Sequence, residues 1–113
     1  MNKSYRDLTV WQASFKLTVD VYKLCKSLPK TEQFGLISQM QRSASSIPSN
    51  IAEGQQRNGK NEFRQFLAIA RGSAAELSTQ LLLANKIYKS EVSNLLAELE
   101  GIQKMLYSLQ AKL

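Results

Sequence analysis

Lysine side chains recur between residues 16 and 30 at a spacing that could present one charged surface. Lys16, Lys23, Lys26 and Lys30 follow one another at intervals of seven, three and four residues. These intervals keep them on one face of a helix, where they could neutralise the phosphates of RNA or DNA. The same row is also typical of the solvated face of a helix, and Asp20 within it can pair with Lys16 or Lys23.

A second basic group lies where the chain is expected to turn between two helices. Arg57, Lys60 and Arg64 occupy this region and could add to a nucleic-acid-binding surface at one end of the molecule. The formal net charge is +6, which is compatible with a polyanionic partner without requiring one. If several copies assemble, their basic residues would bind phosphates more tightly through effective concentration.

A polar segment interrupts an apolar helical pattern around a proline. Its side chains could line a groove for a ligand, or they could satisfy backbone groups that the proline leaves free. Its charged members could form ion pairs between the second and third helices, where such pairs set register more often than they stabilise. The residues concerned are Arg42, Ser46, Pro48, Asn50, Glu53, Arg71 and Glu76.

Several kinds of catalytic chemistry lack their residues. Histidine is absent, which removes the commonest general base, the commonest neutral metal ligand and the Glu-x-x-His motifs of di-iron bundles. Cys25 lies among apolar residues, where a buried structural thiol is more typical than a reactive one. The glycines at 54 and 59 lack the spacing of a phosphate-binding loop. We therefore expect no catalytic residue, no metal site, no cofactor and no enzyme activity.

The chain has 113 residues, of which 43% are hydrophobic and 21% are charged. This balance predicts one globular domain over residues 1–113. No apolar run reaches the roughly 18 residues of a membrane helix, and residues 1–7 lack the apolar core of a signal peptide. The single cysteine cannot build a disulfide framework, which is typical of a reducing compartment. We expect a cytoplasmic protein with no membrane partner.

Apolar residues repeat with a helical period in four segments that short breaks separate. The segments cover residues 7–27, 31 to about 54, 60–89 and 90–113. Because short connections imply antiparallel neighbours, the sequence predicts an all-α, antiparallel up-down-up-down four-helix bundle. No segment alternates like a strand.

The ends and faces of these segments can be predicted in part. Thr31 is expected to cap the second helix, with Glu32 in its first turn. One broad face of the first helix is apolar, and Trp11 and Tyr22 on it are suited to packing in the core or at an interface. That face carries Val10, Trp11, Phe15, Leu17, Val21, Tyr22, Leu24, Cys25 and Leu28.

A proline and two glycines should shape the second and third helices. Pro48 removes one backbone donor and clashes with the carbonyl of Ala44, so the second helix should kink there. Gly54 should help to end that helix. Gly72 lies inside the third helix, where glycine is unfavourable, so we expect another backbone to approach it closely.

Three blocks of the sequence resemble a known family. They are residues 5–12 (YRDLTVWQ), residues 35–54 (GLISQMQRSASSIPSNIAEG), and Glu62-Phe63 with Phe66-Leu67 and residues 70–73 (ARGS). Together they resemble the bacterial four-helix-bundle proteins encoded in 23S rRNA intervening sequences, a family similar to the accessory variability protein of diversity-generating retroelements.

The resemblance implies a homopentameric barrel, no enzyme activity, and nucleic-acid binding as the usual suggestion for members. Members often carry a second arginine beside the position of Arg42, where this chain has Gln41. That departure weakens the case for an arginine pair at this place.

From residues and resemblance together, we expect a non-enzymatic homo-oligomer that binds RNA or DNA through backbone charge, with little base readout. The alternative is a protein-interaction scaffold or accessory subunit without direct nucleic-acid binding, in which the polar region around Pro48 engages a partner protein.

Overall fold

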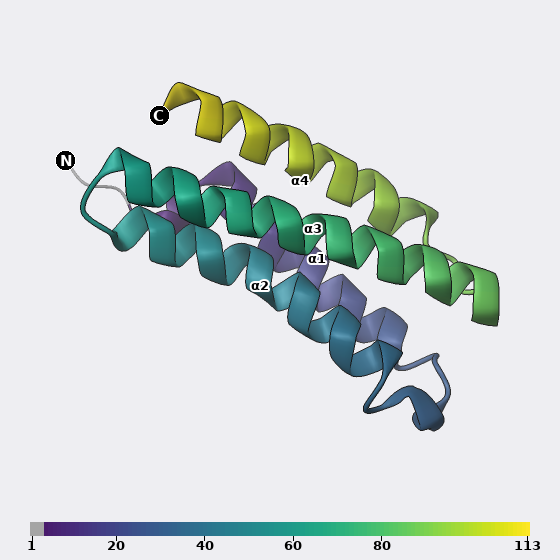
Figure 1. The fold of residues 1–113 in the computed structure, drawn as a ribbon. Coiled ribbons are helices and arrows are strands. Elements are labelled where there is room, and N and C mark those ends of the chain that lie inside the picture. Colours follow the sequence, from purple (N-terminus) through teal and green to yellow (C-terminus); the bar gives the residue numbers. More distant parts are fainter. Residues whose placement is uncertain (1–3) are drawn as a thin grey trace.

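Four long helices form an antiparallel bundle in the computed structural model, which describes residues 4–113 (Figure 1). The helices are α1 (Thr9–Cys25), α2 (Leu36–Gln56), α3 (Lys60–Tyr88) and α4 (Ser93–Lys112), with short 3-10 turns at Tyr5–Asp7 and Lys30–Glu32. No strand occurs within these described residues. The predicted all-α four-helix bundle is confirmed. Residues 1–3 of the expected domain lie outside the described residues.

Helices that follow one another in the sequence pack side by side, and α4 also packs on α1, which closes the bundle. The core is made of apolar side chains that repeat every three or four residues along each helix, and their burial is the main force that holds the helices together. Its fully buried members include Leu17, Val21, Met40, Ile47, Ile51, Leu67, Leu77, Leu81, Ile102 and Leu106.

Two aromatic residues of α1 lie outside this core. Phe15 is 51% exposed and Tyr22 is 46% exposed, so this part of the apolar face is not covered within the single chain. The apolar face of α1 is wider than its neighbours can cover, because Leu17 and Val21 already fill the interior.

The second and fourth helices begin later than predicted because carboxylates cap them from outside. Residues 30–32 form a 3-10 turn, and Glu32 Oε1 accepts a hydrogen bond of 3.0 Å from the backbone N–H of Leu36. Glu91 Oε1 accepts one of 2.8 Å from the backbone N–H of Ser93 in the same way. Thr31 is therefore not the cap of α2, and each acid precedes its helix instead of lying in its first turn.

α2 continues through Pro48 without a break. Pro48 has no N–H, so the carbonyl of Ala44 loses its usual helical partner. Thr18 Oγ1 on α1 lies 3.0 Å from that oxygen and 2.8 Å from the carbonyl of Ser14, and its one proton can serve either acceptor. The freed carbonyl is thus reached from the neighbouring helix. The kink at Pro48 remains a prediction.

We expect Thr18→Val to destabilise the chain by about 1 kcal/mol, because the Ala44 carbonyl would lose its donor. In a Pro48→Ala background, the new N–H of residue 48 can donate to that carbonyl, so the same change should have a clearly smaller effect. Urea denaturation of the wild type, the two single variants and the double variant gives the coupling free energy between residues 18 and 48. Strictly additive effects would contradict this account.

Gly54 and Gly72 have the opposite of their expected surroundings. A Cβ at Gly54 would lie 2.6 Å from Phe66 Cβ and 3.0 Å from Phe63 Cδ1, whereas a Cβ at Gly72 would meet nothing within 4 Å. The prediction of a close backbone at Gly72 is therefore wrong. Gly54 does not end α2 but lies buried within it, where the start of α3 leaves no room for a side chain.

Candidate nucleic-acid interface

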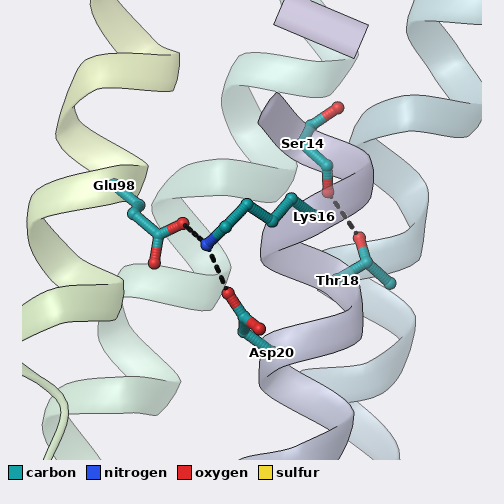
Figure 2. A network of polar contacts seen from close by, with 5 residues as sticks. All are labelled: Ser14, Lys16, Thr18, Asp20 and Glu98. Carbon is teal, nitrogen blue, oxygen red and sulfur yellow. Dashed lines mark hydrogen bonds and ion pairs between the residues drawn. The ribbon is translucent and has the colours of Figure 1, made fainter. Parts of the chain in front are cut away.

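Lys16 lies in the middle of a polar network (Figure 2). Its Nζ is 2.8 Å from Asp20 Oδ2 and 2.9 Å from Glu98 Oε1 on α4. The bond to Asp20, and then the bond to Glu98, raise the pKa of Lys16 above its ordinary value. Two carboxylates face one ammonium group, so Lys16 links α1 to α4 and has no unpaired charge to offer a phosphate.

The other three lysines of the predicted row are free of such partners. Lys23, Lys26 and Lys30 are exposed at the carboxyl end of α1 and in the turn that follows it. Lys16 and Lys23 lie on α1 itself, Lys26 caps its carboxyl end and Lys30 lies in the following 3-10 turn. Of the four, Lys23, Lys26 and Lys30 form no ion pair with a described residue.

Two further lysines lie at the same end of the bundle. Lys86 is in the last turn of α3 and Lys89 follows that helix, and both are exposed. The hydroxyl of Tyr88 donates to Glu32 Oε2, which joins the end of α3 to the turn Lys30–Glu32. The end of α3 and this turn lie at the same end of the bundle, apart from each other (Figure 1). We call this group the basic end. It consists of Lys23, Lys26, Lys30, Lys86 and Lys89.

Sequence reasoning missed Lys86 and Lys89. The predicted bundle topology could have identified them. In an up-down-up-down bundle the first and third helices run in the same direction, so their carboxyl ends lie at the same end of the molecule.

The two glutamates near the basic end are engaged with donors of the chain. The Tyr88 hydroxyl, and then the Leu36 N–H, hold the pKa of Glu32 below its usual range. The hydroxyl and N–H of Ser93 lower the pKa of Glu91 in the same way. Both carboxylates stay ionised at neutral pH, and none of their hydrogen bonds comes from a lysine of the basic end.

Lys89 ends α3 in the left-handed conformation, with φ 60° and ψ 26°. Its backbone N–H bonds to the carbonyl of Asn85 at 2.9 Å. Among the described residues it is the only one other than glycine with a positive φ. Glycine is the usual residue in this position of a helix end.

Arg57 lies at the opposite end of the bundle, where acidic and aromatic residues surround it. Its guanidinium is 2.8 Å from Glu53 and 3.6 Å from Glu62, and it also lies over the ring of Phe66. The bond to Glu53 is the main cause that raises the pKa of Arg57. Its charge is therefore already balanced within the chain.

The other two residues of this predicted group differ from each other. Arg64 donates to the side chain of Asn61 and to the carbonyl of Leu113. Lys60 is exposed and forms no ion pair with a described residue. Of the three, only Arg57 has its charge balanced by a described carboxylate.

A polar groove of about 630 Å³ lies between α2 and α3. Ser46 Oγ lies 2.8 Å from Ser73 Oγ across it, and Asn50 Nδ2 donates to both the carbonyl and the hydroxyl oxygen of Ser46. Arg42 from α2 and Glu76 from α3 also line it. The structure thus brings together four of the predicted polar residues, Arg42, Ser46, Asn50 and Glu76, with Ser73, which was not predicted.

The remaining charged members of the predicted polar group lie elsewhere. Glu53 pairs with Arg57. Arg71 faces α4, where its guanidinium donates to Gln110 Oε1 at 2.9 Å and lies over the ring of Tyr107. No ion pair joins any two of Arg42, Glu53, Arg71 and Glu76, so the ion pairs considered for them are not formed within the described residues.

An apolar groove of about 520 Å³ lies between α1 and α2. Its wall includes Trp11, Phe15, Tyr22 and Pro48, and the ring centroids of Trp11 and Phe15 are 5.0 Å apart. Another set of apolar side chains is exposed on α3. Its members are Ile69, Leu82, Leu83 and Ile87.

Three further observations concern the cysteine thiol, metal-binding side chains and membrane-spanning helices. Cys25 is buried, and burial raises the pKa of its thiol. Within residues 4–113, no three histidine, cysteine, aspartate or glutamate side chains gather where they could hold a metal ion. None of the helices in this range is long and apolar enough to cross a membrane.

The fold and these surfaces define a small antiparallel four-helix-bundle protein with one basic end, one polar groove and one apolar groove. The family model described as 23S rRNA-intervening sequence protein matches residues 6–108 of the chain. The chain belongs to this family. No curated protein matches it.

Proposed function

We propose that the chain is a non-enzymatic, cytoplasmic homo-oligomer that binds the phosphate backbone of RNA or DNA through its basic end. The observation that carries this proposal is the group of five exposed lysines at one end of the bundle, none of which forms an ion pair within the described residues. Lysines that neutralise phosphates release counterions, which drives binding without reading sequence.

Helix dipoles account for only part of this charge. Lys23 and Lys86 lie in the last turns of α1 and α3, where a cation is favourable. Lys26 and Lys89 are the C-cap residues of those helices, and Lys89 Nζ lies 3.5 Å from the carbonyl oxygen of Lys86. Only Lys30 lies farther from both helix ends, so its charge is the part that the dipoles do not explain.

The test is a binding titration of labelled single-stranded RNA and DNA by fluorescence anisotropy, repeated across a series of salt concentrations. We expect a dissociation constant in the micromolar range or tighter at low salt, and an affinity that falls steeply as salt rises. Absence of binding at low salt would overturn the proposal.

Exposed apolar side chains support the homo-oligomeric part of the proposal. The groove that contains Phe15 and Tyr22 lies between α1 and α2, and Leu82, Leu83 and Ile87 are exposed on α3. We propose that a second copy covers these residues. A homopentamer, and kinship with the accessory variability protein of diversity-generating retroelements, belong to this proposal through the sequence resemblance alone.

We expect wild-type protein to have a molar mass that is a multiple of the single chain in light scattering after size exclusion. Phe15→Glu and Leu83→Glu should each shift it toward monomer, because a charge would then face the apolar partner surface. Both residues are substantially exposed in the single chain, so circular dichroism should show unchanged helix content. Ser108→Glu, on the exposed surface of α4, is the control for added charge. A monomeric wild type would contradict this part.

A protein-interaction scaffold is the second candidate function, and the apolar groove beside Pro48 is the observation that favours it. In that case a partner protein, not a second copy, would cover Phe15 and Tyr22. A monomeric wild type that retains one partner after nuclease treatment, and loses it in Phe15→Glu, would favour this candidate over the first.

A further inference from the structure

Three polar side chains of the groove between α2 and α3 have hydrogen-bonding capacity that the described chain leaves unused. Gln80 is only 8% exposed, and its Oε1 has no hydrogen-bond donor. Arg42 and Glu76 line the groove from opposite helices and form no ion pair with each other or with any other described residue. A buried acceptor without a donor calls for a partner from outside.

Small side chains keep the groove open at this place. Ser43, Ser46 and Ser73 line it, and the contact of 2.8 Å between Ser46 and Ser73 fixes the register of the two helices. The volume of about 630 Å³ lies within the range of small-molecule sites. The groove therefore has room for a ligand of the size of a nucleoside.

The same register places the unused groups in order. Arg42 lies one turn before Ser46 on α2, and Glu76 lies one turn after Ser73 on α3. Because the helices are antiparallel, both lie in the same direction from the serine contact, on opposite sides of the groove. Gln80 is one turn farther along α3.

The three groups differ in what they can bind. The Arg42 guanidinium only donates hydrogen bonds, whereas the Glu76 carboxylate and Gln80 Oε1 only accept them. A matching ligand needs acceptors on one edge and donors on the other. Guanine has this pattern, with acceptors at N7 and O6 and donors at N1 and the exocyclic amine, whereas adenine carries an amine donor beside its N7.

We propose that this groove binds a guanine base. Arg42 donates to N7 and O6, and Glu76 accepts from N1–H and the amine. Gln80 Oε1 is covered by the chain in the free protein, and it accepts the remaining amine proton after its side chain rotates toward the groove. A free guanine nucleotide and an unstacked guanine in a single strand present the same edges. Only the single-strand form rests on the proposed nucleic-acid function.

The first experiment titrates the full chain with GMP, IMP, AMP and CMP by isothermal calorimetry. IMP lacks the amine of guanine, so the difference between the affinities for GMP and IMP measures the contribution of that amine without altering the protein. We expect GMP to bind about 5- to 150-fold more tightly than IMP or AMP, the range for one well-formed bidentate contact to a base. Equal affinities for GMP and AMP, or no binding of GMP, would overturn the proposal.

Protein variants then assign the contacts. Glu76→Gln should weaken GMP about tenfold or more and reduce the preference for GMP over IMP, since only the contact of the amine with Gln80 then remains. Arg42→Gln should weaken GMP and IMP by similar factors, because both retain N7 and O6. Glu76 and Arg42 are exposed, so melting temperatures should not change. Glu100→Gln on α4 is the matched control. An unchanged ratio of GMP to IMP in Glu76→Gln would overturn the assignment.

A second binding experiment identifies the source of the base. It compares labelled oligouridine that contains one internal guanine with the same strand containing one cytosine, at equal charge. A preference for the guanine strand supports a site for an unstacked guanine, and equal affinities with retained GMP binding support a free nucleotide. If both strands bind in a salt-dependent way but GMP does not bind, the guanine site is excluded while the basic end remains supported.

Discussion

Replacing Lys23, Lys26 and Lys30 together with glutamine is expected to weaken the binding of single-stranded RNA or DNA by about two orders of magnitude at 0.1 M salt. Each lysine at a phosphate of a single strand adds about 0.7 to the slope of log affinity against log salt, so three should reduce the slope by about 2. All three are exposed and form no ion pair within the described residues, so the fold should survive. Anisotropy titrations across a salt series measure both effects.

The matched control removes the same charge elsewhere. Lys60, Lys104 and Lys112 are exposed, with Lys104 in an exposed ion pair of 3.7 Å with Glu100. Their joint replacement by glutamine lowers the net charge by the same amount. This control should lose much less affinity, because screening limits charges far from the bound strand. Equal losses in the two triple variants would show that net charge, and not the basic end, governs binding.

Gly54→Ala is expected to destabilise the chain by about 1–3 kcal/mol, although alanine is the better helix former by about 1 kcal/mol. The new Cβ would lie 2.6 Å from Phe66 Cβ. That atom is next to the backbone of α3, so a rotamer change cannot relieve the clash and the two helices must move apart. Urea denaturation, monitored by circular dichroism, measures the change in the free energy of unfolding.

Gly72→Ala is the control, and its effect should have the opposite sign. A Cβ at Gly72 meets nothing within 4 Å, so alanine should stabilise α3 by about 0.5–1 kcal/mol through its helix propensity. If both substitutions changed stability in the same direction, the close approach at Gly54 would not be the cause.

The helix count and the bundle could be predicted because buried positions such as Leu77 and Leu81 repeat with the helical period. The starts of α2 and α4 could not, since Glu32 and Glu91 cap from outside these helices, a geometry that depends on the turns before them. The exposure of Phe15 could not be predicted from the apolar periodicity either. Periodicity identifies an apolar face but does not say how much of it the neighbouring helices cover.

The residues of the candidate site could be predicted only where their position depends on a single helix. The lysine row on α1 follows from spacing, whereas the neutralisation of Lys16 depends on Glu98, which lies 82 residues later in the chain. Gln80 gives no signal in the sequence, because its burial arises only when α2 lies against α3. Contacts between helices determine which polar residues remain available, and local patterns do not contain them.

The left-handed backbone at Lys89, at the end of α3, lowers the stability of the fold while it keeps a charged side chain in place. A residue with a Cβ is less stable in this conformation than glycine by about 1 kcal/mol. The chain therefore keeps a positive charge at a position where glycine would make the fold more stable. Sequences that are selected for stability alone tend to lose such residues, and stabilised variants often lose activity for this reason. A thermostable redesign that placed glycine at position 89 would therefore remove one of the five positive charges at that end of the bundle.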